Sequence, residues 1–117
     1  MLTYDQTAKK DADKPRCGLV PPAIIEAIGR VRSFGVKKYA DPDNWLRVEK
    51  ERYVDALLRH ICKYLRDPKG VDKESGLPHL EHAACNMAFI LELDERQRLA
   101  NAKETGPAKT GPVSSDG

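Results

Sequence analysis

Two histidines and an asparagine recur at helical spacing in the second half of the chain. His79, His82 and Asn86 stand at positions i, i+3 and i+7, so a helix would place their side chains on one side. The three groups could converge on a metal ion, a ligand or another side chain. A single buried histidine is more often a hydrogen-bonded core residue, but this trio beside an acidic loop favours a functional site. We therefore predict that His79 and His82 are catalytic and that Asn86 contacts substrate.

The acidic loop lies directly before these residues. Asp72 and Glu74 are separated by a single lysine, and carboxylate oxygens are the preferred ligands of hard cations such as Mg²⁺ and Mn²⁺. Asp55 could add a third carboxylate, or it could form a surface ion pair with Arg59 four residues later. The sequence leaves both roles of Asp55 open. The predicted metal ligands are Asp55, Asp72 and Glu74, and the last two are also candidate catalytic groups.

A zinc site is the less favoured alternative. The spacing His79-x-x-His82-x-x-Cys85 resembles a set of zinc ligands, but on a helical wheel Cys85 points away from both histidines, towards a strip that could face water. The chain also has no Cys-x-x-Cys pair. Oxygen ligands and Mg²⁺ or Mn²⁺ suit the Asp- and Glu-rich surroundings better.

A second group of candidates lies earlier in the chain. Lys37 and Lys38 could bind phosphate oxygens, and Trp45, the only tryptophan, could stack on a base. Solvated lysines and a tryptophan that anchors the core are the alternative, which the pattern by itself favours.

Three helical segments would have to position these residues. The first begins at Pro21-Pro22 and either ends at Gly35 or continues through Tyr39; proline is well tolerated at a first helical position. The second runs from about residue 49 to 65 and carries a clean amphipathic stripe. The third runs from about residue 77 to 100, with Ser75 as its expected N-cap. No segment alternates with period two, so we predict an all-α fold, a compact bundle of about three main helices.

The third segment is apolar almost all round. Only a narrow strip, consisting of Glu81, Cys85, Glu92 and Glu95, could face water, and helices of this kind are buried.

The remainder of the chain sets limits on organisation. Of the 117 residues, we expect 15–100 to form one helical domain, 1–14 to be a flexible segment and 101–117 to be a disordered tail. A domain this small has a limited core, so we expect a homo-oligomer, dimeric or higher. The net charge of +2 comes from interspersed signs, which argues against direct DNA binding. No run is long enough to span a membrane, and three scattered cysteines suggest a reducing cytoplasm.

Several strings of the chain, taken together, resemble a known family. They are Lys14-Pro15-Arg16, Leu19 to Pro22, Phe34 to Tyr39, Asn44-Trp45, Asp55 to His60 and Asp72 to Asn86. The set resembles the phage-associated dATP/dGTP diphosphohydrolase N-terminal domain family, which is similar to the MazG-like all-α nucleoside triphosphate pyrophosphatases. The resemblance covers about residues 14–93.

The resemblance implies hydrolysis of dATP or dGTP to the monophosphate and pyrophosphate, in phage nucleotide metabolism within the cytoplasm of the bacterial host. Carboxylates would hold Mg²⁺, which activates a water. The resemblance implies that Lys37, Lys38 and Arg59 contact the phosphates. Asn44 and Trp45 are the candidates for contact with the base. Tyr39 and His60 complete the predicted substrate contacts. MazG-like enzymes carry ExxE and ExxD motifs on facing helices, and this chain has no such pair on its predicted buried faces.

Two alternatives to the enzyme remain. The first is a non-catalytic nucleotide binder, for example one that sequesters a signalling nucleotide of host defence; histidines where carboxylates are expected favour it. The second is a helical scaffold whose histidines are hydrogen-bonded within the core. The enzyme and the binder both predict a small-molecule nucleotide as partner, whereas the scaffold predicts no nucleotide binding.

Overall fold

The computed structural model describes residues 3–105, with side chains through residue 104. Within this range the chain forms three α-helices and two short 3-10 helices, and no β-strand, which confirms the predicted all-α fold. The elements are η1 (Cys17–Leu19), α1 (Pro22–Tyr39), η2 (Asn44–Arg47), α2 (Lys50–Arg66) and α3 (His79–Thr105). None of these helices is long and apolar enough to cross a membrane.

Helix α1 runs through Gly35 and ends at Tyr39. Pro22 occupies its first turn, as expected for a residue whose missing N–H has no intrahelical partner there. Ala40 closes the helix in the left-handed conformation (φ 55°), and its backbone N–H donates to the Val36 carbonyl at 2.7 Å. The continuation past Gly35 matters for the site, because it carries Lys38 and Tyr39 on an ordered helix.

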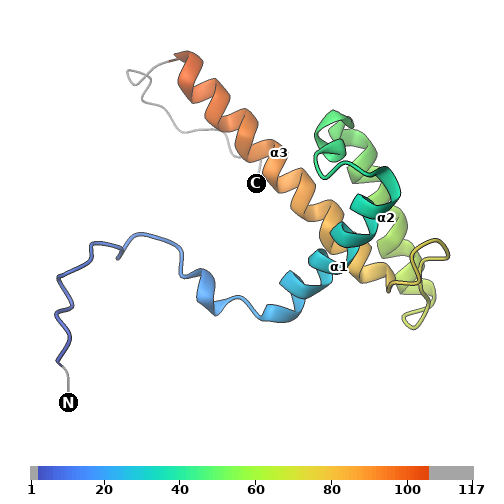
Figure 1. Cartoon of the computed structure of the whole chain (residues 1–117), viewed down its shortest axis with the longest axis horizontal. Helices are drawn as coiled ribbons and strands as arrows, with labels where there is room; N and C mark the ends of the chain where they lie inside the picture. The colour runs from blue at the N-terminus through green and yellow to red at the C-terminus, as the bar shows by residue number, and fades with distance from the viewer. Residues whose placement is uncertain (1–2, 106–117) are drawn as a thin grey trace.

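Helix α3 is the central element, and both α1 and α2 pack against it (Figure 1). Its C-terminal part extends beyond the other two helices, and its residues from 94 to 104 are all exposed. The helix continues to Thr105, five residues beyond its predicted end. It therefore has a packed half and an exposed half, and only the packed half can contribute to a site.

The predicted surroundings of the packed half were wrong in two respects. Cys85 was expected on a strip facing water, but it is 2% exposed and lies in the core. Leu80, Met87 and Leu91 were expected to be buried, but they are exposed. Both errors have one cause: α1 and α2 cover the polar side of α3, which carries His82 and Asn86, and leave its most apolar face open.

Buried apolar side chains in the described range are few and small. They are Ala27, Ala83 and Cys85, and His79 is the one buried polar residue of this range. Since stability grows with the apolar area removed from water, three small side chains are a modest core for a chain of this size.

The connection between α2 and α3, residues 67–78, is a tight loop rather than a long excursion. The Asp72 N–H donates to the Leu77 carbonyl and the Gly76 N–H donates to the Asp72 carbonyl, both at 2.8 Å. Gly76 has φ 74°, a conformation that glycine adopts without steric cost. An isolated antiparallel bridge joins Val71 to Pro78 and closes the loop. The loop thus returns the chain to α3 with Asp72, Glu74 and Ser75 held on it.

Ser75 does not cap α3, contrary to the prediction. The helix begins at His79, and the Pro78 carbonyl accepts from the N–H groups of Glu81 and His82 at its first turn. The Ser75 side chain instead bonds to His82 and to the Leu77 N–H, so its role lies in the site.

Candidate functional site

A pocket of about 350 Å³ opens between α1, η2, α2, the loop 67–78 and α3. This volume lies within the range of small-molecule sites. We call it the polar pocket. The side chains that give it its chemistry are the cations Arg32 and Lys38, the carboxylates Asp41, Asp72 and Glu74, the polar residues His60, His82 and Asn86, and the aromatic residues Tyr39, Trp45 and Phe89.

Asp72 is held by the loop's own backbone. Its Oδ2 accepts the N–H groups of Glu74 at 3.1 Å and Ser75 at 2.9 Å. Burial would raise the pKa of the Asp72 carboxyl, but the hydrogen bonds from Ser75 and the neighbouring His82 outweigh it, so the pKa lies below its usual value. Asp72 therefore keeps its negative charge at neutral pH in a partly buried position.

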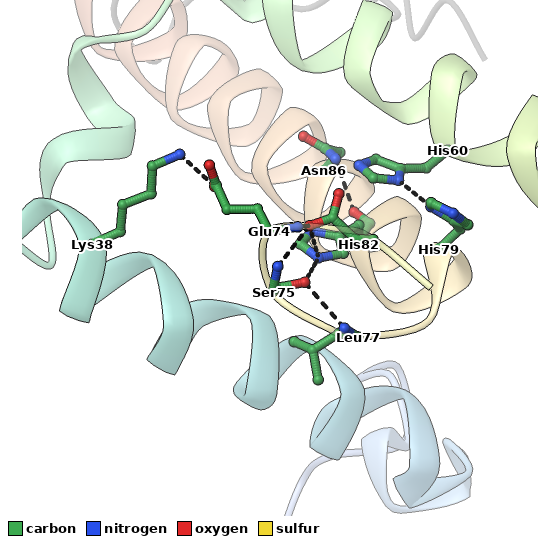
Figure 2. A network of polar contacts seen from close by, with 9 residues as sticks. Lys38, His60, Glu74, Ser75, Leu77, His79, His82 and Asn86 are labelled. Atoms are coloured by element: carbon green, nitrogen blue, oxygen red, sulfur yellow. Dashed lines mark hydrogen bonds and ion pairs between the residues drawn. The ribbon is translucent and has the colours of Figure 1, made fainter. Parts of the chain in front are cut away.

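His82 and Ser75 form a close pair (Figure 2). The Ser75 Oγ lies 2.6 Å from His82 Nε2, and the same oxygen accepts the Leu77 N–H at 3.1 Å. Because that acceptor position is filled, the Ser75 hydroxyl proton is free to point at His82 Nε2. Burial lowers the pKa of His82 more than Asp72 raises it, so the ring is neutral near pH 7 and offers a lone pair.

The Ser75–His82–Asp72 group is not a nucleophilic triad. In such a triad the carboxylate holds the imidazole nitrogen opposite the one that faces the serine. Here Asp72 Oδ2 lies 3.8 Å from Nε2, the nitrogen that already faces Ser75. The geometry therefore suits a base that accepts a proton from water through the Ser75 hydroxyl better than a triad serine activated for attack.

A pair of histidines, His60 and His79, supports the Ser75–His82 pair. His60 Nδ1 lies 3.0 Å from His79 Nδ1, and the His60 ring stacks on His82 with centroids 4.7 Å apart. Burial, helped by the neighbouring His82, lowers the pKa of His60 to about 4. His60 is thus neutral at physiological pH, and one nitrogen of the His60–His79 pair must be an acceptor. The pair fixes the ring against which His82 lies.

Lys38 and Glu74 bridge the pocket from opposite sides. The ammonium of Lys38 on α1 lies 2.5 Å from Glu74 Oε1 on the loop (Figure 2). The hydrogen bond to Glu74 raises the pKa of Lys38 above its ordinary value. Both side chains are substantially exposed, so this ion pair contributes little to stability and its partners can be exchanged.

An aromatic wall forms another part of the pocket. Trp45 stacks on Phe89 with centroids 4.8 Å apart and planes 14° apart. Tyr53 holds this wall by donating its hydroxyl to the Trp45 carbonyl at 2.7 Å. The Arg32 guanidinium lies 5.3 Å from the Phe89 centroid, and its Nη2 donates to the Pro42 carbonyl at 2.5 Å. Trp45 is therefore both an anchor of the fold and a lining residue.

The predicted trio of metal ligands does not come together. Asp72 and Glu74 line the pocket, but Asp55 lies exposed on α2 and does not. Within residues 3–105 no group of three or more His, Cys, Asp or Glu side chains could hold a metal ion by itself. Of the three predicted ligands, Asp72 and Glu74 are thus the two that line the pocket.

Most of the sequence-predicted residues meet in the polar pocket. Those that line it are Lys38, Tyr39, Trp45, His60, Asp72, Glu74, His82 and Asn86. His79 is buried and reaches the pocket through His60. Four predicted residues lie outside it: Asp55, Lys37 and Arg59 are exposed, and the Asn44 side chain accepts from Arg47.

Arg32, Phe89 and Cys85 line the pocket and were not among the predicted site residues. Arg32 stands one and two helical turns before Gly35 and Tyr39, so extending the wheel of α1 backwards would have found it. Burial raises the pKa of the Cys85 thiol to about 11, so it is neutral and serves as packing. No pattern in the sequence distinguishes Phe89 from other core aromatic residues.

Comparison with known proteins gives a consistent result. Residues 4–103 match the family described as "dATP/dGTP diphosphohydrolase, N-terminal". The chain is 36% identical over 103 residues to a protein of Salmonella phage PMBT28 named "dATP/dGTP diphosphohydrolase". The match covers 88% of this chain and 35% of the relative, so the chain spans about a third of that protein's length. No solved structure matches.

Proposed function

Because the chain belongs to the family of dATP/dGTP diphosphohydrolase N-terminal domains, we propose that it hydrolyses a purine deoxynucleoside triphosphate in the polar pocket. The products would be the deoxynucleoside monophosphate and pyrophosphate. The phage origin of the named relative supports a role in phage nucleotide metabolism, in the cytoplasm of the bacterial host.

The proposal rests on one observation. The neutral side chain of His82 lies beside the carboxylates of Asp72 and Glu74, in a pocket that also holds the cations Lys38 and Arg32. His82 Nε2 lies 3.8 Å from the Asp72 carboxylate, while Lys38 and Glu74 meet at the same pocket. A triphosphate needs cations for its oxygens, and phosphoryl transfer relies on positioning and on stabilising charge. Lys38 and Arg32 supply the positive side chains of the pocket.

Exchange of ion-pair partners would open the pocket to substrate. A phosphate oxygen can take Lys38 from Glu74, since the pair is exposed and weak. Glu74 is then free to face a metal-bound triphosphate beside Asp72, which stays held by the loop backbone. When bound, Mg²⁺ would neutralise phosphate charge and lower the pKa of a water.

The proposed reaction is a single displacement by water at the α-phosphorus. A new bond forms between the water oxygen and this phosphorus, and the bond from phosphorus to the α,β-bridging oxygen breaks to release pyrophosphate. His82 Nε2 takes the hydroxyl proton of Ser75, 2.6 Å away, as Ser75 Oγ takes the proton of the attacking water. His60 stacks on the ring and keeps it in place.

The aromatic wall suits the base of the nucleotide. Trp45 and Phe89 line the same pocket as the charged groups, and Tyr39 is exposed at its edge. Because Phe89 already covers Trp45, we assign the base to the remaining aromatic surface, including Tyr39, and not to the space between the two rings.

A second candidate function is nucleotide binding without turnover. It is favoured by the metal-ligand result, since within residues 3–105 no set of three side chains is arranged to hold a resident metal. In that case Lys38 and Arg32 bind phosphate and the histidines remain structural. Such a protein would sequester its nucleotide, for example against a host defence signal.

The deciding experiment is pyrophosphate release from each of the four dNTPs with Mg²⁺ or Mn²⁺, alongside a thermal-shift scan of the same mixtures. We expect turnover of dATP or dGTP, and its loss in excess EDTA. His82→Asn should lower the rate by about 10² to 10⁴, the usual contribution of a general base. Arg59→Ala, which removes a charge outside the pocket, should leave the rate unchanged.

Each outcome selects one function. A thermal shift with no pyrophosphate from any dNTP would reject the enzyme and support the binder. Absence of both signals would leave the helical scaffold. Full activity in His82→Asn, with the Asn variant folded, would reject His82 as the base even if the chain is an enzyme.

A further inference from the structure

The side-chain amide of Asn86 is held in one orientation at the polar pocket. Its Nδ2 donates to the His82 carbonyl, one turn earlier on α3, at 2.8 Å. Because a carbonyl oxygen can only accept, nitrogen must be the amide atom that faces it, and Oδ1 must face elsewhere. In Figure 2 this oxygen points away from His60.

The Oδ1 atom of Asn86 is an acceptor that the fold does not use. Within residues 3–105 no hydrogen bond reaches it, and every fully buried side-chain nitrogen or oxygen of that range has a partner. Oδ1 must therefore be open to solvent, and Asn86 lines the polar pocket. The pocket thus presents an oriented acceptor to any ligand that enters it.

The helix itself gains little from an asparagine at this position. Asn86 stands well inside α3, and asparagine has a lower helix propensity than alanine. Its hydrogen bond to the carbonyl four residues earlier competes with the ladder of the helix rather than extending it. A ligand explains the amide better than the stability of the fold does.

Along α3, Asn86 lies between the two ends of the polar pocket. His82, Asn86 and Phe89 line the pocket in this order, with steps of about 6 and 4.5 Å along the helix axis. In the proposed function His82 marks the attacked α-phosphorus, and Phe89 belongs to the aromatic wall beside which the base lies. A nucleotide presents phosphate, sugar and base in the same order, so its sugar falls beside Asn86.

We infer that Asn86 Oδ1 accepts a hydrogen bond from the 3′-hydroxyl of the nucleotide sugar, an inference that rests on the proposed function. This is the one free hydroxyl of the sugar in a deoxynucleoside triphosphate. An amide oxygen can accept its proton without adding a negative charge beside the triphosphate. The bond would set how far the nucleotide enters, and so where the α-phosphorus lies relative to His82.

This contact defines a class of substrate. A mononucleotide with a free 3′-hydroxyl can make the bond. A nucleotide whose 3′-oxygen carries a phosphate, as within a polynucleotide, cannot, because that oxygen has no proton to donate. Asn86 is therefore a specificity-determining residue that selects free mononucleotides.

The test is the affinity of the full chain for nucleotides that differ only at the 3′ position, measured by calorimetric titration with Mg²⁺. The probes are the α,β-methylene analogues of dATP and dGTP, which cannot release pyrophosphate, and their 2′,3′-dideoxy counterparts. We expect the wild type to bind the 3′-hydroxyl form about tenfold more tightly, as for one hydrogen bond partly shielded from water. Asn86→Ala should bind both forms equally. A purely structural loss would lower both affinities together and leave their ratio unchanged.

A matched control is Asn44→Ala. The Asn44 side chain accepts from Arg47 outside the polar pocket, so this variant should keep the wild-type ratio. Should Asn86→Ala misfold, Asn86→Gln keeps the amide but displaces its oxygen by one methylene, and it should also reduce the ratio.

The outcomes separate this inference from the function on which it rests. If the wild type binds both forms equally, or if Asn86→Ala keeps the full ratio, the sugar contact is overturned while the nucleotide site stands. If Asn86→Ala loses only a preference for dGTP over dITP, whose base lacks an amino group, Oδ1 contacts the base and the sugar contact is again overturned. If no analogue binds, the proposed function fails and this inference fails with it.

Discussion

The polar pocket lies on one side of α3. On the other side, α1, α2 and α3 form a second hollow of about 630 Å³ with a mainly aliphatic lining, the apolar groove, and the two differ in whether their lining side chains already have partners. In the polar pocket nearly every charged or polar group already has a partner, as Lys38 has Glu74 and His82 has Ser75. In the apolar groove the ion pair of Arg30 and Glu81 is internal, and the side chains of Leu80, Met87 and Leu91 are exposed. A ligand can replace an existing partner of a side chain in the polar pocket, whereas a ligand of the apolar groove can only cover side chains that are now exposed.

This difference indicates what each hollow can bind. Polar groups that compensate one another at the surface lose little when a ligand replaces one partner, so the polar pocket suits a small charged molecule that comes and goes. Exposed aliphatic surface gains free energy only by being covered, so the apolar groove suits a lasting contact. The polar pocket is thus the candidate site of chemistry.

The largest expected effect distinguishes Asp72 from Asp55, which the sequence analysis predicted together as metal ligands. Asp72→Asn should lower turnover of the purine dNTP by a hundredfold or more, which is about 3 kcal/mol of transition-state stabilisation. The reason is that Asp72 is a charged carboxylate beside His82 in the polar pocket. Asp55→Asn should have no effect, because Asp55 is exposed and outside that pocket. Steady-state pyrophosphate release measures both.

Equal losses in the Asp72 and Asp55 variants would mean that the site is not the polar pocket described here. Loss in neither would remove the carboxylates from the mechanism. A urea titration of each variant separates a lost catalytic charge from a loop that no longer folds, since Asp72 also accepts two backbone N–H groups.

A second expected effect concerns acid stability. The pKa of His60 is about 4 in the folded chain and near 6.5 in the unfolded chain, so below pH 6.5 the unfolded state takes up the proton first. Stability is therefore lost as the pH falls from 6.5 to about 4, by roughly 3 kcal/mol at most. The lowered pKa of His82 acts in the same direction, whereas the carboxylates act only at lower pH.

Urea midpoints at pH 7 and pH 4.5 check this effect in the wild type and in His60→Gln. The glutamine variant should lose less stability between these two values, whatever its stability at pH 7. Leu91→Ala, in the apolar groove, should show the wild-type pH dependence, because it changes no titrating group. An equal loss in His60→Gln and wild type would show that His60 is already protonated, or solvated, in the folded chain.

The sequence predicted the helices well, for a physical reason. The stripe of α2 and the breakers on either side of it define that helix locally, and its observed bounds, Lys50–Arg66, differ from the prediction by one residue at each end. The trio of His79, His82 and Asn86 was also predicted to share one side of a helix, which follows from spacing alone. In the structure all three lie at or beside the polar pocket.

The sequence could not predict which side of α3 would be covered. The third segment is apolar almost all round, and apolar character alone favoured burying nearly every side of it. The choice depends on where α1 and α2 cross α3, which is set by long-range packing. This explains why Cys85 proved buried and Leu91 exposed, and why Asp55 and Arg59, plausible by type, point away from the pocket.

The smallest expected effect comes from a comparison of two adjacent lysines. It tests whether a phosphate can replace Glu74 as the partner of Lys38 in the polar pocket. Lys38→Met should weaken binding of the triphosphate about tenfold, or roughly 1.4 kcal/mol, because the phosphate loses one cation while Glu74 keeps a free charge. Lys37→Met removes the same charge one residue earlier, on a side chain that is exposed and outside the pocket, and should change affinity little. Calorimetric titration with a non-hydrolysable dATP or dGTP analogue measures both at one salt concentration.

Glu74→Gln completes the comparison: with metal absent it should bind the analogue slightly better than wild type, since Lys38 is then already free. Equal losses in the two lysine variants would assign the effect to net charge, and the polar pocket would no longer differ from the rest of the surface in how it attracts an anion.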